Sequence, residues 1–296
     1  MTMKRRARVA AVQWADRAFS SLDELEGSLE APLAEAARAG AELAIFPAGV
    51  SEALARVLAL DSPDATGSRQ LPEALDALAA SLARAWRVTL GLGPVVVPGP
   101  EGPARVSSLF SPDGRLLGRQ PQTHRTPVEQ RAAGLARGRD LTPIETPVGL
   151  VGLVNGADLL YPEVSRILCL QGADILVHQG LVSDFSEAVA LSRLWREVQA
   201  NQVFGVEAYA AGPGRRGRSA VHAPLEITPG QDGFLARAAA DGEPQVVIAD
   251  FDPDALAKLL ETYPIHAFRN PRQYARYFPE LYRAAMTEGG SDDGRA

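Results

Sequence analysis

Few side chains in this sequence could act as a nucleophile or as a catalytic cation. Cys169 is the only cysteine, and the only lysines are Lys4 and Lys258. Because a thiolate is a strong nucleophile and an ammonium stabilises developing negative charge, this scarcity restricts the covalent chemistry that the chain could perform. The carboxylates Glu129 and Asp158 could instead form a pair for general acid–base catalysis.

Each candidate also has a structural interpretation. Cys169 falls in an apolar helical pattern, which favours a small buried hydrophobe over a reactive thiol. Asp158 follows an apolar strand, so we expect it to hold its turn by accepting backbone N–H bonds, with catalysis as the alternative. His178 ends a predicted strand and is expected to face the mouth of a pocket, where it could contact a ligand.

The elements around Asp158 form a strand, a tight turn, a helix and a strand. Val148–Val154 is a Val-rich apolar run that ends at Asn155-Gly156, and this pattern predicts a buried strand followed by a sharp turn. A helix is predicted to begin near Pro162 and to end at Gln171-Gly172. Hydrolases often display a nucleophile in such a strand-to-helix turn.

The segment Gly156–Glu163 resembles the nucleophile turn of the nitrilase (carbon–nitrogen hydrolase) superfamily, which is roughly Cys-x-Asp-x-x-Phe-Pro-Glu. The aspartate, aromatic residue, proline and glutamate of that motif are present as Asp158, Tyr161, Pro162 and Glu163. Gly156 stands at the position of the nucleophilic cysteine.

The N-terminal half extends this resemblance. The family places a general-base glutamate after a Phe-Pro pair, and here Phe46-Pro47 is followed by Ala48. A Lys-x-His tripeptide follows a hairpin in the family, and Gln122-Thr123-His124 stands in that register. Glu129 matches a second family glutamate that lines the pocket.

The resemblance therefore implies a family member without the Glu-Lys-Cys triad, because Ala48, Gln122 and Gly156 supply neither base, cation nor nucleophile. We expect no catalytic residue of the family type, no metal and no cofactor. The pocket candidates are Glu129, Asn155, Asp158 and His178.

Three functional hypotheses follow. The first is a catalytically inactive pseudoenzyme that binds a small ligand or a protein partner. The second is a hydrolase that uses other groups, around Asp158 and Glu129. The third is a structural subunit that assembles with an active paralogue. The resemblance also implies an α/β fold, a four-layer α-β-β-α sandwich in one domain at 1–286, which forms a homodimer or a higher oligomer. Residues 287–296 are expected to be a disordered tail.

Composition agrees with a globular protein that acts away from nucleic acid and membranes. The chain has 296 residues, 46% of them hydrophobic and 22% charged, with a formal net charge of −6. The negative charge argues against a nucleic-acid or membrane-surface partner. The N-terminus carries no long apolar segment, so we expect a cytoplasmic location.

The sequence makes specific predictions for four further segments. Val88–Val97 is predicted to be one strand and Ser186–Gln202 one helix. The arginine-rich segment 215–218 is predicted to be a solvated turn. Arg272–Tyr282 resembles the C-terminal tail that crosses to a partner subunit in the family.

Overall fold

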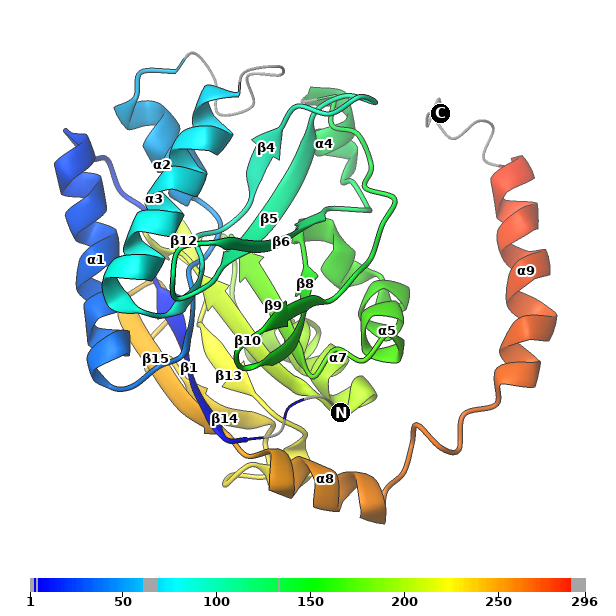
Figure 1. Ribbon diagram of the computed structural model, residues 1–296. Helices are drawn as coiled ribbons and strands as arrows, with labels where there is room; N and C mark the ends of the chain where they lie inside the picture. Colours follow the sequence, from blue (N-terminus) through cyan, green and yellow to red (C-terminus); the bar gives the residue numbers. More distant parts are fainter. Residues whose placement is uncertain (1–2, 4, 61–68, 133, 289–296) are drawn as a thin grey trace. The chain divides into compact units, whose positions relative to one another are not determined.

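The computed structural model describes the chain except for residues 1–2, 4, 61–68, 133 and 289–296 (Figure 1). Two compact units are present, Met1–Leu256 and Ala257–Ala296. Among the described residues, no helix combines the length and the apolar composition that crossing a membrane requires.

The first sheet of the larger unit has 7 strands. Its centre is parallel and is formed by β1 (Ala7–Gln13), β2 (Leu43–Ile45) and β3 (Thr89–Gly91). The strands, in spatial order, are β15 (Gln245–Phe251), β1 (Ala7–Gln13), β2 (Leu43–Ile45), β3 (Thr89–Gly91), β5 (Ala104–Phe110) and β4 (Val95–Val97), with β6 (Leu116–Pro121) paired to β5.

The second sheet has 6 strands and contains the predicted strand–turn–helix–strand unit. Its centre, formed by β8, β9 and β10, is parallel, so the carboxyl ends of these strands lie at the same end of the sheet. The strands, in spatial order, are β14 (Phe234–Arg237), β13 (Ala220–His222), β10 (Phe204–Tyr209), β9 (Ile175–Gly180), β8 (Gly149–Val154) and β7 (Ile144–Thr146).

Helices cover the outer faces of the two sheets, which pack against each other through β1 and β10. The first sheet is covered by α1 (Leu22–Arg38) and α3 (Gln70–Trp86), with α2 (Val50–Val57) beside them, and the second by α5 (Pro162–Leu170) and α7 (Leu194–Asn201). The predicted four-layer α-β-β-α sandwich is therefore confirmed.

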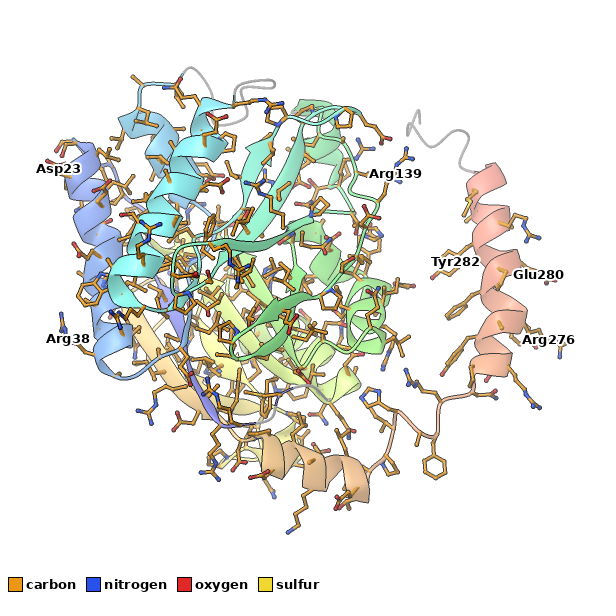
Figure 2. The ribbon with its side chains drawn as sticks, in the orientation of Figure 1. Asp23, Arg38, Arg139, Arg276, Glu280 and Tyr282 are labelled. Atoms are coloured by element: carbon orange, nitrogen blue, oxygen red, sulfur yellow. The ribbon has the colours of Figure 1, made fainter. Side chains whose placement is uncertain are left out.

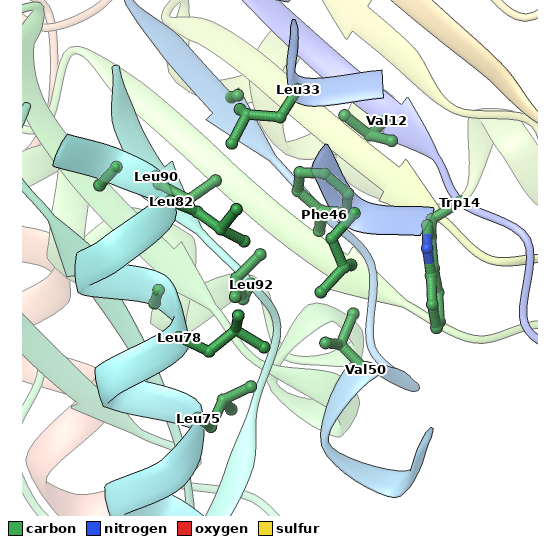
Figure 3. Close-up of a cluster of buried hydrophobic side chains, with 14 of the residues drawn as sticks. Val12, Trp14, Leu33, Phe46, Val50, Leu75, Leu78, Leu82, Leu90 and Leu92 are labelled. Carbon is green, nitrogen blue, oxygen red and sulfur yellow. The ribbon is translucent and has the colours of Figure 1, made fainter. Parts of the chain in front are cut away.

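Helix α1 shows how the sequence builds these layers. The Ser21 hydroxyl accepts a hydrogen bond from the Glu24 N–H and so caps the helix. Leu25, Leu29 and Leu33 recur every four residues and are fully buried against the sheet. Figure 3 shows the resulting cluster, in which side chains of α1, α2 and α3 meet those of the first sheet.

The contact between the two sheets is both aromatic and polar. Phe204 of β10 stacks on Phe251 of β15 with a centroid distance of 4.3 Å. The Gln179 Nε2 at the end of β9 donates to the Phe46 carbonyl just beyond β2, at 2.8 Å. The carboxyl ends of β2 and β9 thus lie together, and we call this end of the sandwich the strand-end edge.

The predicted single strand Val88–Val97 is instead two strands, β3 and β4. The chain turns at Gly93, whose φ of +101° suits glycine, and Pro94 has no N–H for a ladder bond. A Cβ at Gly93 would lie 2.4 Å from the Pro47 carbonyl oxygen, so the turn also packs closely on the segment before Ala48.

The predicted single helix Ser186–Gln202 is also divided, into α6 (Glu187–Leu191) and α7. Arg193 interrupts it with a non-helical backbone, φ −105° and ψ −136°. Its guanidinium carbon lies 6.0 Å from the ring centroid of Tyr209. Helical periodicity alone could not show this break, because it coincides with a contact to a residue on another element.

The smaller unit contains α9 (Pro271–Glu288), which includes the predicted C-terminal tail. Tyr282 projects from one side of this helix, while Arg276 and Glu280 project from the other (Figure 2). Residues 287 and 288 end α9, and the rest of the predicted disordered tail lies outside the described residues.

We predict that Phe251→Ala destabilises the protein by about 3–5 kcal/mol, because it removes a fully buried ring from between the sheets. Urea unfolding followed by circular dichroism measures this loss. Phe268→Ala is the matched control, since Phe268 is 82% exposed and its truncation should change the free energy of unfolding by less than about 0.5 kcal/mol. Equal effects of the two substitutions would contradict the assignment of the Phe204–Phe251 contact.

Candidate functional site

The strand-end edge carries the positions that the sequence comparison singled out. Gln122 directly follows β6, Gly156 follows β8 by two residues, and Ala48 follows β2 by three. The Asn155 Nδ2 donates to the Gln120 carbonyl at 2.6 Å and so joins the end of β8 to β6. Ala48 is also buried. It lies beside Gly93, because a Cβ built on Gly93 would be 3.4 Å from the Ala48 Cα.

Gln122 and Gly156 are in direct contact. Gly156 has a φ of +48°, and a Cβ built there would lie 2.7 Å from the Oε1 of Gln122. The Gln122 side chain is buried, and its Nε2 donates to the His124 carbonyl at 2.6 Å and to Glu129 Oε2 at 3.1 Å. Because both partners are acceptors, the nitrogen must face them and the oxygen must face Gly156. The amide therefore occupies the space into which a side chain at 156 would project.

The oxygen of this amide lacks a hydrogen-bond partner among the described residues. A buried carbonyl without a partner costs about 1–3 kcal/mol. The two bonds made by the nitrogen offset part of this cost and fix the amide in one orientation.

Asp158 is fully buried and anchors the loop that follows β6. Its carboxylate accepts from the Thr123 N–H at 3.0 Å, the Thr123 hydroxyl at 2.8 Å, the His124 N–H at 2.7 Å and the His124 Nδ1 at 3.0 Å. The expectation that Asp158 holds its own turn therefore needs correction, because these partners lie on the facing loop. Tyr161 stacks on the His124 ring at 3.7 Å and holds the same loop from the outside.

Glu129 belongs to a capping box at the start of α4 (Pro127–Ala132). The Glu129 N–H donates to the Thr126 hydroxyl at 3.2 Å, and the Thr126 N–H donates to Glu129 Oε2 at 2.8 Å. The other carboxylate oxygen faces the Nε of Arg105 at 3.7 Å. The Thr-Pro-x-Glu pattern could have predicted this cap from the sequence.

His178 is buried beside the end of β8. Its Nδ1 lies 2.9 Å from the Val154 carbonyl, which can only accept, so this nitrogen carries the proton. Burial lowers the pKa of His178, against the opposing charge of Glu207, and favours the neutral imidazole. The Tyr209 ring meets the imidazole edge-on at 6.0 Å.

A second polar cluster on β10 and β13 was not predicted. The Tyr209 hydroxyl donates to Glu207 Oε1 at 2.6 Å, and the His222 Nε2 lies 3.2 Å from Glu207 Oε2. Burial alone would raise the pKa of Glu207, but the hydrogen bonds from His222 and Tyr209, together with the charges of His222 and His178, outweigh it and the pKa falls. A glutamate within the apolar run 203–210 was the available signal, since such a residue needs internal partners.

Cys169 is not a reactive thiol in this structure. It lies on α5 and packs against the apolar cluster between α5, α7 and the second sheet. Burial raises the pKa of this thiol to about 12, so it stays protonated at neutral pH.

Comparison with known proteins agrees with this architecture. The carbon–nitrogen hydrolase family model matches residues 8–259. The probable hydrolase YhcX of Bacillus subtilis (strain 168) is 23% identical over 278 residues, which cover 90% of this chain and 54% of that protein. An N-carbamoylputrescine amidase of Solanum tuberosum is 25% identical over 160 residues, which cover 50% of this chain and 51% of that protein. The chain thus spans about half the length of the curated relatives it matches.

A solved structure supplies the fold comparison. An amidase mutant from Nesterenkonia sp. AN1, which carries acrylamide added to its active-site cysteine, superposes with a TM-score of 0.68 at 20% identity. The superposition covers 87% of this chain and 99% of the amidase. With a family model that matches most of its length and a sandwich of the same fold, this protein belongs to the carbon–nitrogen hydrolase family.

Proposed function

We propose that this chain is a non-hydrolytic member of the carbon–nitrogen hydrolase family that acts by binding a protein partner. The observation that carries the proposal is the contact between Gln122 and Gly156. At the position that corresponds to the family nucleophile there is no side chain, and the neighbouring amide fills the space that one would use.

The other two triad positions support the same conclusion. Gln122 is neutral, so it cannot stabilise a tetrahedral oxyanion as a lysine would, and Ala48 cannot accept a proton. Loss of one oxyanion donor alone lowers turnover by roughly 10²–10³. The Nesterenkonia amidase reacts with acrylamide at an active-site cysteine. In this chain the only cysteine is Cys169, a protonated and largely buried residue of α5.

The hypothesis of a hydrolase built on Asp158 and Glu129 is less well supported. Asp158 accepts bonds from four donor atoms of Thr123 and His124, and Glu129 is committed to its helix cap and to Gln122. A general base needs a free lone pair directed at a substrate. These two carboxylates instead use their lone pairs to hold the loop after β6.

Exposed apolar surface favours a protein partner over a small ligand. On the outer side of the second sheet, Ile167 and Leu170 of α5 are 40% and 52% exposed, and Leu160, just before that helix, is 65% exposed. In the smaller unit, one face of α9 exposes large apolar side chains, namely Tyr274, Tyr277, Phe278, Leu281, Tyr282 and Met286. Apolar clusters of this kind mark interaction sites. The partner is a second copy of the chain or an active paralogue.

The contact between Gln122 and Gly156 predicts that substitutions at these two positions have non-additive effects on the free energy of unfolding. Gly156→Ala should destabilise the protein, because its Cβ would meet the Gln122 oxygen and its φ of +48° disfavours a side chain. Gln122→Ala removes the obstructing amide, so the double variant should be more stable than the sum of the single effects predicts, by about 0.5–3 kcal/mol. Urea unfolding of the four proteins measures this coupling.

Gly172→Ala provides the control for the cycle. Gly172 also has a positive φ, +99°, but a Cβ there meets only a Leu150 methyl group, at 3.6 Å. The changes in the free energy of unfolding caused by Gly172→Ala and Gln122→Ala should therefore be additive. Equal coupling in both cycles would show that the Gln122 amide does not occupy the space beside Gly156.

The wild-type chain should release no ammonia from aliphatic amides, nitriles or carbamoyl amines above the buffer background. The nucleophile, the base and the cation are absent together, and removal of one member of such a unit already abolishes most turnover. The assay should include Cys169→Ala and Glu129→Gln, of which the second keeps an acceptor for the Thr126 N–H. Steady turnover in the wild type that one of these variants abolishes would identify the true catalytic group and refute the proposal.

We expect the chain to form a dimer or a larger oligomer, burying on the order of 2,000 Å² or more of its surface. Light scattering at micromolar concentration measures the mass. A chain that ends before Arg272 lacks the apolar face of α9 and should dissociate at higher concentration than the full chain. A monomeric full-length chain that also fails to bind an active paralogue would rule out this part of the proposal.

A further inference from the structure

The arginine-rich segment is not the solvated turn that the sequence suggests. It contains β12 (Arg215–Arg216), which pairs with β11 (Ala211–Gly212) in a small hairpin. Arg216 Nε donates to Asp241 at 2.6 Å, and the Arg218 guanidinium donates to the Ala238 carbonyl at 2.6 Å. Each arginine of the segment therefore has a partner on another part of the chain.

Arg215 of this segment pairs with Asp16, which follows β1. The Asp16 side chain is only 11% exposed. The Arg215 Nε donates to Asp16 Oδ2 at 2.9 Å, and Arg56 of α2 reaches Asp16 Oδ1 at 3.3 Å. One carboxylate thus pairs with two guanidinium groups, of which Arg56 is 52% exposed and Arg215 is 34% exposed.

Backbone hydrogen bonds also join the hairpin to the segment that contains Asp16. The Asp16 N–H donates to the Ala211 carbonyl at 2.8 Å, and the Ala211 N–H donates to the Trp14 carbonyl at 2.7 Å. Gly212 has a φ of +120°, and a Cβ there would lie 2.7 Å from the Asp16 carbonyl oxygen. Only glycine permits so close an approach at this point.

Asp16 also lies beside the loop that carries Ala48. A Cβ on the next residue, Gly49, would lie 3.5 Å from a Leu181 methyl group and 3.8 Å from Asp16 Oδ2. The Arg216 N–H donates to the Val182 carbonyl just beyond β9, at 3.0 Å. The hairpin, the end of β9 and the Ala48 loop thus lie around one carboxylate, whose side chain is 11% exposed.

We propose that the β11–β12 hairpin is a strap across the strand-end edge at Ala48, and that Asp16 is the latch that keeps it closed. Each strand of the hairpin is short, so ladder bonds alone cannot hold it. Removing the Asp16 carboxylate leaves Arg56 and Arg215 as an uncompensated like-charge pair, which favours opening. The inference holds whether or not the centre beside Gly156 is catalytic.

Hydrogen exchange of the full-length protein, followed by mass spectrometry, tests the latch. Asp16→Asn should raise the exchange rate of the 211–216 amides and of the Ala48 loop about tenfold, while the central strands β9 and β10 stay protected. Asp250→Asn is the matched control, because Asp250 binds the Arg8 guanidinium through both oxygens on β15. It should leave the exchange of 211–216 unchanged.

A thiol probe gives an independent readout. Ala48→Cys, made together with Cys169→Ala, places one thiol under the strap. Its labelling by iodoacetamide should be slow, and adding Asp16→Asn should accelerate it about tenfold. Arg215→Gln should produce the same acceleration, and it keeps the test decisive if the Asp16 variant does not fold.

Two outcomes would overturn the proposal. Unchanged exchange of 211–216 and unchanged labelling in the Asp16 and Arg215 variants would show that the ion pairs do not hold the hairpin. A uniform rise of exchange across both sheets would show that Asp16 contributes only to global stability.

Discussion

The close approach of the Gln122 amide to Gly156 is the constraint on which the strand-end edge depends. Glycine is needed at 156 both for its φ of +48° and because a Cβ would lie 2.7 Å from the Gln122 oxygen. The amide nitrogen in turn bonds to the His124 carbonyl and to Glu129. One residue without a side chain thus determines how the loop after β6 and the start of α4 are held together. A side chain at 156 would require the Gln122 amide to shift.

This arrangement gives part of the family motif a structural role. Asp158 and Tyr161 both hold the His124 segment. Asp158 accepts hydrogen bonds from it, and Tyr161 stacks on the His124 ring. Their role is independent of a nucleophile, so the turn keeps its form when position 156 is glycine. Gln122 and Ala48 are buried and neutral, so neither position carries the desolvation cost of a buried charge, a cost that active sites normally carry.

Two further acids, the buried Glu207 and the largely covered Asp16, illustrate the same principle. Glu207 receives bonds from Tyr209 and His222, and Asp16 is paired with Arg56 and Arg215. Buried carboxylates are tolerated only when donors satisfy them, and here the donors come from different elements. Each acid therefore connects parts of the chain: Glu207 joins β10 to β13, and Asp16 joins β1, α2 and the β11–β12 hairpin.

The periodicity and turn residues of the sequence predicted most helices and strands in their order, because these signals act over short distances. The resemblance to a known family implied the four-layer class and supplied the candidate site residues. The sequence did not show that Asp158 would bond to Thr123, which is 35 positions away, nor that the Gln122 oxygen would face Gly156. The breaks at Gly93 and Arg193 were also missed. Each of these features depends on contacts between residues that are distant in the sequence, and local propensity carries no information about such partners. Only the tertiary structure decided them, since packing selects one conformation among several that the local sequence permits.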